Sequence, residues 1–225
     1  RRRFKPYLRR TPSTLSAVGR HETPHPGPRR RRRASKDTKE YIVQAIDVQD
    51  DIKNVLFSKE EINAKVAELA ARIDEDYAGK DVLLVGVLKG AIMIMADLSR
   101  ALKGHYTMDW MAVSSYGSGT KSSGVVRILK DLDTDLVGRN VLIVEDIIDS
   151  GLTLAWLQQN LISRGAASVE ICTLLRKPKV VKADVEVKYV GWDIEPEFVV
   201  GYGLDFAEKY RNLDCVATLH PHVYS

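Results

Sequence analysis

Short apolar runs alternate with amphipathic stretches through most of this chain of 225 residues. Short runs rich in Val, Ile and Leu are typical of strands buried on both faces of a parallel sheet. Strands are predicted at 82–87, 108–114, 125–130, 141–144, 169–175, 185–190 and 198–201, after a short strand within 47–57. Helices are predicted at 58–77, 91–102 and 153–164. Because the two kinds of element alternate, the predicted fold class is α/β, with a mostly parallel, twisted sheet and helices on both faces.

The first predicted helix has a start signal in the sequence. Ser58 and Glu61 have the spacing of a capping box, in which each side chain accepts a hydrogen bond from the other residue's backbone N–H. Apolar residues then recur at helical spacing and predict one buried face: Ile62, Val66, Leu69 and Ile73. Gly165 follows the helix 153–164 and suits the left-handed conformation that ends many helices.

The apolar run 141–144 leads directly into residues that can hold a ligand. Two carboxylates follow it, and then a turn that opens a helix: Glu145, Asp146, Asp149, Ser150, Gly151 and Thr153. In open α/β sheets, ligands bind outside the carboxyl ends of strands, and the amides at a helix N-terminus favour an anion. The glycine allows close backbone approach, the hydroxyls add donors, and the adjacent carboxylates can accept from a polyol. This layout suits ribose 5-phosphate.

An Asp-Ser-Gly turn alone is more simply interpreted as an ordinary helix cap. The thirteen residues 141–153 together resemble the phosphoribosyl-diphosphate signature of the type I phosphoribosyltransferases, in which two acidic residues close a hydrophobic strand before an Asp-Ser/Thr-Gly-x-Thr loop. The resemblance implies that the whole turn contacts substrate, including Ile148 and Leu152. Some relatives carry Lys where this chain has Leu152, so one charge is missing beside the loop.

Two further loops match this resemblance. Leu88, Lys89 and Gly90 follow the strand 82–87 and are similar to the pyrophosphate-binding loop of the family, where the Leu88–Lys89 peptide would be cis. The sequence alone does not decide this isomer, and an ordinary strand-to-helix loop is the alternative. The small, polar segment 115–124 is similar to the family's flap, which opens with Ser115 and Tyr116 and would exclude water. A plain mobile hairpin loop is the alternative there.

The end of the chain indicates the branch of the family. Taken singly, Lys177 is more simply a solvated strand end, and Phe198 is more simply a core residue. In order and spacing, five residues match the purine-binding end of the hypoxanthine-guanine phosphoribosyltransferases: Lys177, Phe198, Val199, Asp205 and Arg211. The resemblance covers about residues 47–223 and implies a small hood beside the main sheet.

This resemblance implies a role for each of these five residues. Lys177 would donate to the purine 6-oxo group, Phe198 would stack on the ring, and the backbone of Val199 would pair with the base edge. Asp205 would hold a second Mg²⁺, and Arg211 would contact pyrophosphate.

The implied reaction is the transfer of ribose 5-phosphate from phosphoribosyl diphosphate to N9 of hypoxanthine or guanine, which gives IMP or GMP and pyrophosphate. Mg²⁺ is the implied cofactor, with Glu145, Asp146 and Asp205 as its ligands. Asp149 would accept the proton from N7 of the purine. The preference among hypoxanthine, guanine and xanthine does not follow from the sequence. The family also implies a homodimer or a homotetramer, without deciding between them.

Two alternatives remain open at this stage. One is a transferase of the same fold for adenine or a pyrimidine, although Lys177 donates where adenine would need an acceptor. The other is a nucleic-acid-binding regulator that keeps the fold and binds phosphoribosyl diphosphate as a signal. Such a regulator has no need of Asp149, Asp205 and a flap together.

The N-terminal segment and the rest of the chain carry net charges of opposite sign. Residues 1–35 hold eleven Arg and one Lys against one acid, which gives +11, so the net charge of +4 leaves 4 − 11 = −7 for residues 36–225. Five of the eight prolines also lie in 1–35. We therefore expect 1–40 to be a disordered tail and 41–225 to be the phosphoribosyltransferase domain. The tail has no apolar core typical of a secretory signal. A translated upstream stretch or a nonspecific polyanion-binding arm is expected, and 1–40 are not assigned to the mature protein.

The remaining composition indicates a cytoplasmic enzyme. Cys172 and Cys215 have neither metal-ligand nor C-x-x-C spacing, and two buried thiols suit a reducing compartment. No apolar run is long enough for a membrane span, so no membrane partner is expected. The basic isoelectric point of about 9.0 comes from the tail, so it is no evidence for nucleic acid as a partner of the domain.

Overall fold

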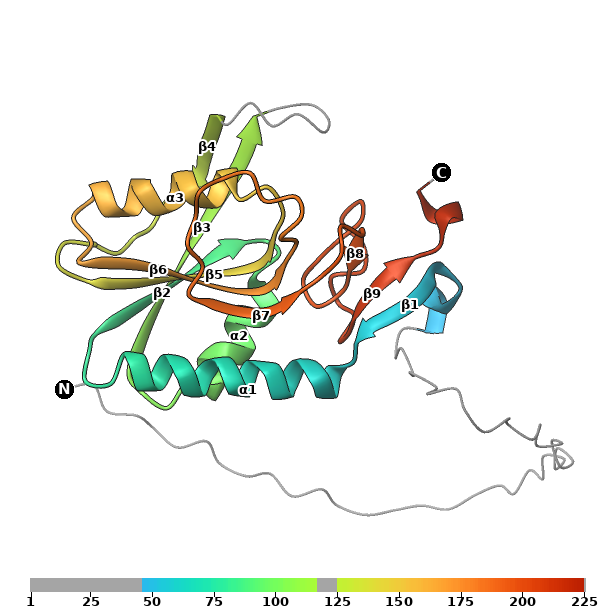
Figure 1. Cartoon of the computed structure of the whole chain (residues 1–225), viewed down its shortest axis with the longest axis horizontal. Coiled ribbons are helices and arrows are strands. Elements are labelled where there is room, and N and C mark those ends of the chain that lie inside the picture. The colour runs from blue at the N-terminus through green and yellow to red at the C-terminus, as the bar shows by residue number, and fades with distance from the viewer. Residues whose placement is uncertain (1–45, 117–124, 225) are drawn as a thin grey trace, which may run out of the picture. The chain divides into compact units, whose positions relative to one another are not determined.

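A computed structural model describes residues 46–116 and 125–224 of the chain (Figure 1). These residues belong to a compact unit that spans Glu40–Ser225. The predicted tail 1–40 lies wholly outside the described residues, as does the flap segment 117–124, so both stay predictions. Among the described residues, no helix is long and apolar enough to cross a membrane.

The main sheet has six strands in the order β4-β3-β2-β5-β6-β7, and all neighbours are parallel except β3 and β4. Its strands are β2 (Val82–Leu88), β3 (Tyr106–Tyr116), β4 (Val125–Lys130), β5 (Asn140–Ile148), β6 (Ser168–Arg176) and β7 (Tyr189–Asp193). The helices are α1 (Lys59–Asp76), α2 (Ile92–Ala101) and α3 (Leu152–Ser163). The predicted mostly parallel α/β sheet is therefore confirmed.

The two faces of the sheet are covered by different helices. In β2, Val82 and Leu84 belong to a core cluster with residues of α1 and α2, whereas Leu83 and Val85 belong to a cluster with residues of α3. Figure 1 shows α1 and α2 below the sheet and α3 above it. Successive side chains of a strand point to opposite faces, so a continuous apolar run supplies both cores at once.

The predicted start of α1 is confirmed in detail. The Glu61 N–H donates to Ser58 Oγ at 3.3 Å, and the Ser58 N–H donates to Glu61 Oε2 at 2.9 Å. Two of the free donors at the helix start are thereby satisfied. At the end of α3, Gly165 has a φ of 89°, as expected for a residue that ends a helix.

A second, three-stranded antiparallel sheet forms the hood, in the order β1-β9-β8. Its strands are β1 (Ile52–Phe57), β8 (Val199–Val200) and β9 (Val216–Leu219), flanked by the short 3-10 helices Ile46–Asp51 and Pro221–Val223. A separate cluster that includes Val200, Tyr210, Cys215 and Ala217 fills it. The hood carries the loop 201–211, called here the hood loop, toward the main sheet.

One predicted strand is wrong over most of its length. Residues 185–188 are not in a strand, and β7 begins only at Tyr189. Val185 packs beside the core cluster of α3, and a Cβ placed on Gly151 would lie 3.2 Å from its Cγ1. The Lys182 N–H also donates to the Ser150 carbonyl at 2.9 Å. The segment thus covers the turn before α3 instead of extending the sheet.

Candidate active site

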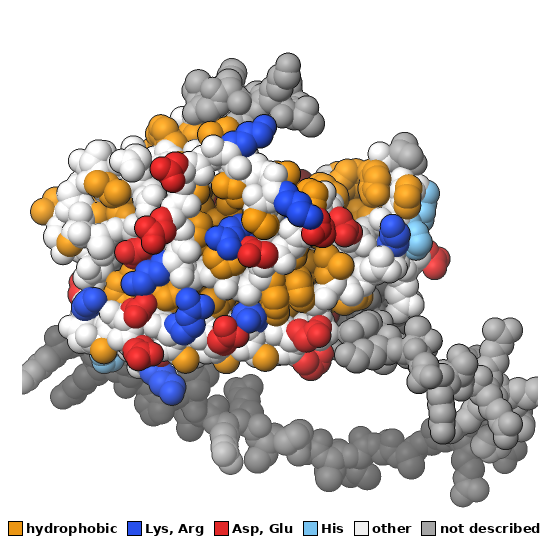
Figure 2. Space-filling view, in the orientation of Figure 1, with side chains coloured by type: hydrophobic (Ala, Val, Ile, Leu, Met, Phe, Trp, Pro, Cys, Tyr) orange, Lys and Arg blue, Asp and Glu red, His pale blue; other side chains and the backbone are white. Residues whose placement is uncertain are grey.

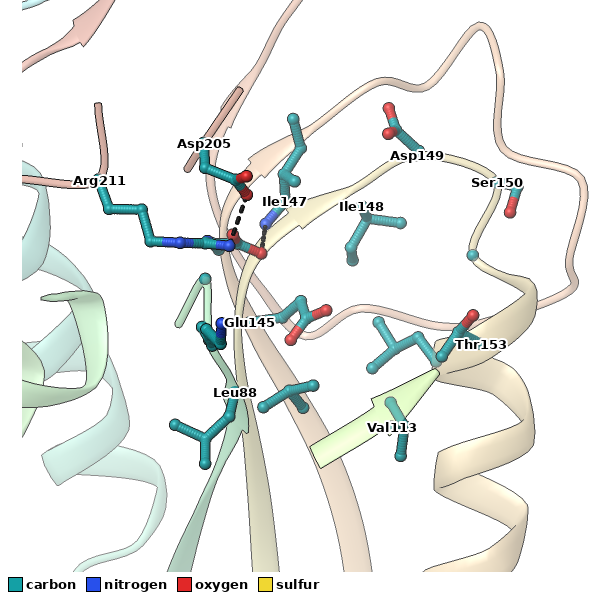
Figure 3. Close-up of a pocket in the computed structure, with 16 residues that line it drawn as sticks. Leu88, Val113, Glu145, Ile147, Ile148, Asp149, Ser150, Thr153, Asp205 and Arg211 are labelled. Carbon is teal, nitrogen blue, oxygen red and sulfur yellow. Dashed lines mark hydrogen bonds and ion pairs between the residues drawn. The ribbon is translucent and has the colours of Figure 1, made fainter. Parts of the chain in front are cut away.

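A pocket of about 360 Å³ opens at the carboxyl ends of β2 and β5 (Figure 3). Most residues predicted to bind substrate line it, together with apolar neighbours: Val87, Leu88, Lys89, Gly90, Val113, Glu145, Asp146, Ile147, Ile148, Asp149, Ser150, Gly151, Thr153, Leu154, Asp205 and Arg211. Figure 3 shows Ser150 and Thr153 beside the start of α3, while Asp205 and Arg211 come from the hood loop on the other side. Segments that follow strands of two different sheets therefore contribute to one pocket.

The turn after β5 has the geometry of an anion site. Gly151 has a φ of 74° and is the N-cap residue of α3, so the amides of the first helical turn point out of the helix start. The Ser150 and Thr153 residues line the pocket beside these amides. The helix begins at Leu152, one residue before the predicted start, and Leu152 itself is not a lining residue.

Glu145 and Asp146 lie inside β5, which is longer than the predicted run 141–144. Burial raises the pKa of Glu145, and the neighbouring Asp146 raises it further. Burial also raises the pKa of Asp146 to about 6, against the opposing effects of the Ile147 N–H, which donates to it at 2.7 Å, and of Arg211. Glu145 Oε2 is buried and has no hydrogen-bond partner among the described residues. An orphaned buried acceptor of this kind suits a ligand hydroxyl or a hydrated cation.

The loop after β2 approaches this pair closely. A Cβ on Gly90 would lie 1.8 Å from Asp146 Oδ2, so only glycine fits there. Gly203 of the hood loop, with a φ of 100°, comes equally near, since its Cβ would lie 2.0 Å from the Gly90 carbonyl oxygen. The Leu88–Lys89 peptide is cis, as the family resemblance implies.

The hood loop holds a cation at the edge of the pocket. Arg211 Nη2 lies 2.7 Å from Asp205 Oδ1 (Figure 3). Arg211 Nη1 also donates to the Gly203 carbonyl at 2.8 Å. Asp205, which was expected to bind metal, is thus paired with the residue expected to bind pyrophosphate. The described residues contain no ready-made group of three His, Cys, Asp or Glu side chains for a metal ion.

Lys177 and Asp149 form an ion pair, with Nζ 2.7 Å from Oδ1. The Lys177 side chain is only 11% exposed, whereas that of Asp149 is 60% exposed. The Lys177 N–H also donates to the Ile148 carbonyl at 2.9 Å, which fixes the loop after β6 against the end of β5. The structure therefore brings together the predicted donor to the base and the predicted proton acceptor.

Three described residues predicted to bind the base, Lys177, Phe198 and Val199, are not among the residues that line this pocket. Phe198 is 51% exposed and packs edge-on against Phe206 with ring centroids 5.8 Å apart, next to Tyr224. Val199 is buried in β8. Ser115 and Tyr116 end β3, and their side chains are not among the described ones.

One polar contact residue was missed by sequence reasoning. Glu208 Oε2 lies 3.0 Å from Lys89 Nζ and 3.4 Å from Arg211 Nη2. Its backbone has a φ of 64°, a conformation that L-residues seldom adopt and that the sequence does not indicate. The only available signal was its position three residues before Arg211.

Comparisons with known proteins agree with this geometry. The sequence profile of the phosphoribosyl transferase domain matches residues 54–207. A hypoxanthine-guanine phosphoribosyltransferase of Mycobacterium bovis is 57% identical over 180 residues, which cover 77% of this chain and 89% of that protein. One of Bacillus subtilis is 51% identical over 177 residues, covering 79% and 98%.

A solved structure extends the agreement from sequence to fold. The crystal structure of a hypoxanthine phosphoribosyltransferase from Staphylococcus aureus matches with a TM-score of 0.78 and 48% identity, and the match covers 80% of this chain and 98% of that one. With a matching domain profile, closely similar relatives and the same fold, the chain belongs to the hypoxanthine-guanine phosphoribosyltransferases.

Proposed function

We propose that this enzyme binds a 6-oxopurine with its O6 and N7 edge facing Lys177 and Asp149, and transfers to it the 5-phosphoribosyl group of phosphoribosyl diphosphate. Its bases are hypoxanthine and guanine, and its products are IMP or GMP and pyrophosphate. The observation that carries the assignment of the base is the ion pair of Lys177 Nζ and Asp149 Oδ1 at 2.7 Å. O6 and N7 lie on the same edge of a 6-oxopurine. A donor next to an acceptor therefore matches the 6-oxo group beside a protonated N7, whereas the 6-amino group of adenine would face another donor.

In the reaction, the bond from C1′ of ribose to the pyrophosphate oxygen breaks and the bond from N9 to C1′ forms. The purine loses its N7 proton, which Asp149 accepts. General-base assistance of this kind is worth about 10²–10⁴-fold. Lys177 keeps the base in register while the proton moves. Phe198 stacks on the ring and the backbone of Val199 pairs with its edge.

The sugar phosphate is assigned to the turn 149–153. The amides at the start of α3 and the hydroxyls of Ser150 and Thr153 bind the 5′-phosphate. Glu145 and Asp146 accept hydrogen bonds from the ribose diol, and the unpartnered, buried Glu145 Oε2 supports this assignment. Leu152 contributes its backbone only, so no side-chain charge assists this phosphate.

The donor set also fits Mg²⁺. Carboxylate oxygens are hard ligands, and Glu145, Asp146 and Asp205 would hold the ion or its waters at the pocket. When bound, Mg²⁺ neutralises charge on the departing pyrophosphate. Lys89 and Arg211 bind the same anion from the two loops that meet there, and Ser115 and Tyr116 open the flap that excludes water.

The proposal also covers the enzyme's location, its oligomeric state and the bounds of its domain. The enzyme acts in the cytoplasm as a homodimer or homotetramer, its domain spans 41–225, and its tail 1–40 takes no part in catalysis. Positive and negative side chains are interspersed on the face shown in Figure 2, which gives nucleic acid no uniform basic surface there.

The test is to follow absorbance with hypoxanthine, guanine, xanthine and adenine, each with and without Mg²⁺. Magnesium-dependent turnover of hypoxanthine or guanine, with adenine at least about 10²-fold slower, is expected from the donor at position 6. Turnover of adenine at a comparable rate would refute the assignment of the base, and binding of phosphoribosyl diphosphate without turnover of any base would indicate a sensor.

A further inference from the structure

The pocket is bounded on one side by two loops from different sheets, and a single carboxylate joins them. Lys89 follows β2 in the main sheet, and Arg211 ends the hood loop. One oxygen of Glu208, Oε2, lies 3.0 Å from Lys89 Nζ and 3.4 Å from Arg211 Nη2. Lys89 and Arg211 line the pocket, whereas Glu208 is not among its lining residues. The carboxylate therefore contacts both cations from outside the cavity.

The hood loop is built to hold this carboxylate in place. The Glu208 N–H donates to Asp205 Oδ2 at 2.9 Å, and both Ala207 and Glu208 have positive φ, at 51° and 64°. This turn directs the Glu208 side chain toward the loop after β2, where it meets Lys89. Arg211 in turn contacts three acceptors, in Gly203, Asp205 and Glu208, so the direction of its guanidinium is fixed.

We propose that Glu208 is a positioning residue that aligns Lys89 and Arg211 for the pyrophosphate group of the substrate. This inference rests on the proposed function, which assigns these two cations to pyrophosphate. Lys89 is 65% exposed and has a long flexible side chain, so without a partner it would sample many rotamers. Glu208 restricts the Lys89 side chain to fewer rotamers. Less conformational entropy is then lost when the substrate binds.

A carboxylate near an anion site can also oppose binding. Glu208 is 65% exposed, so water and salt screen its repulsion for a pyrophosphate inside the pocket. Its contacts with Lys89 and Arg211 are direct, and these cations hold the pKa of Glu208 below its usual value. Alignment therefore outweighs repulsion, and removing Glu208 should weaken pyrophosphate binding. If Glu208 were instead a gate that competes with pyrophosphate, its removal would strengthen binding.

The experiment compares Glu208→Gln and Glu208→Ala in the full chain. Binding of Mg²⁺–pyrophosphate is measured by calorimetry, and KM is measured separately for phosphoribosyl diphosphate and for hypoxanthine. We expect Glu208→Ala to weaken the binding of pyrophosphate and of phosphoribosyl diphosphate by about twofold to fivefold, which lies within the range for exposed ion pairs, and to leave the KM for hypoxanthine unchanged. Glu208→Gln keeps an acceptor oxygen and should lose less.

Two controls make the result specific. Glu68→Ala breaks another Lys–Glu ion pair, with Lys65 at 2.6 Å on α1, and should change none of these constants. In a double-mutant cycle, Lys89→Ala with Glu208→Ala should cost less than the sum of the two single changes. Tighter pyrophosphate binding by either Glu208 variant, equal changes for both substrates, or full additivity in the cycle would overturn the proposal.

The calorimetry separates this proposal from the proposed function. Mg²⁺–pyrophosphate binding does not require turnover, so it reports on Lys89, Arg211 and Glu208 even if the purine base were assigned wrongly. Active enzyme with pyrophosphate affinity unchanged in both Glu208 variants would refute the positioning role alone. Wild-type protein that binds pyrophosphate but turns over no 6-oxopurine would refute the proposed function alone.

Discussion

Replacing Asp149 by Asn removes the proposed proton acceptor while keeping the size of the side chain. The amide can still accept a hydrogen bond from Lys177, whose Nζ lies 2.7 Å from Asp149 Oδ1. It cannot take the N7 proton of the purine. We therefore expect the rate of the chemical step to fall by about 10²–10⁴-fold, which corresponds to about 2.7–5.5 kcal/mol at 1.36 kcal/mol per tenfold.

The structural cost of the same change is much smaller. Asp149 is 60% exposed, and Asn keeps an acceptor for the 11% exposed Lys177, so the change should cost about 0–1 kcal/mol in stability. For a domain of this size, that corresponds to a shift of about 2–4 °C in Tm at most. The turn 149–153 should still form, because Asn caps a turn as well as Asp does. The loss of rate should thus exceed the loss of stability several-fold in free energy.

The assay is a single-turnover measurement of IMP formation, beside a direct titration of Mg²⁺–phosphoribosyl diphosphate. Glu195→Gln is a matched control, because it also removes the charge of an exposed carboxylate that pairs with a lysine. Lys179 Nζ lies 2.6 Å from Glu195 Oε2. Slow chemistry with nearly normal binding is the expected result for Asp149→Asn. A variant with normal single-turnover chemistry and poor binding would show that Asp149 supports the phosphate loop and is not the base.

Three further predictions follow from the same site. Lys177→Ala should weaken hypoxanthine binding, measured as KM, by about 1–3 kcal/mol, because the lost donor leaves the 6-oxo group unpaired. The KM for phosphoribosyl diphosphate should stay nearly unchanged, and equal shifts in both KM values would contradict a contact between Lys177 and the base. Gly90→Ala should abolish turnover, because its Cβ would lie 1.8 Å from Asp146 Oδ2; kinetics at wild-type levels would refute the close approach. Deleting residues 1–35 should change kcat/KM by less than about tenfold, or 1.4 kcal/mol, and leave Tm unchanged; a larger loss would place the tail at the site.

Local patterns were enough to predict most of the main sheet. Each apolar run that supplies both cores, such as 82–87, is found as a strand, and the capping box at Ser58 starts its helix as expected. These features depend on neighbours in sequence, so a single chain reveals them. The segment 185–188 also alternates apolar and polar residues, but it packs over Gly151 instead of pairing. Tertiary packing overrode the local pattern there, and no rule of periodicity could have shown it.

Strands were predicted at the positions of β1 and β8, but that they form a separate hood was implied only by the family resemblance. The third strand, β9, has four residues, too few for a periodic signal to separate it from a loop, and it was not predicted. β9 pairs with β1, whose residues lie more than 150 positions earlier, so no local pattern indicates their contact. The positive φ of Glu208 could not be predicted either. Positive φ is expected at Gly or Asn, and a Glu gives no such signal.

The site itself depends on these non-local contacts. Motifs placed Glu145, Asp146 and the turn 149–153 at one strand end, because parallel strands bring their carboxyl ends to a common edge. They did not show that Lys177 pairs with Asp149, or that Glu208 ties Lys89 to Arg211. In the first pair, a donor and an acceptor that follow successive strands meet, as the proposed contact with a 6-oxopurine requires. In the second, the hood supplies a carboxylate that contacts a cation of the main sheet. If Lys89 and Arg211 bind pyrophosphate as proposed, the hood and the main sheet must keep their relative position for both cations to reach it. A substitution at Glu208 should therefore act on pyrophosphate binding and spare the base.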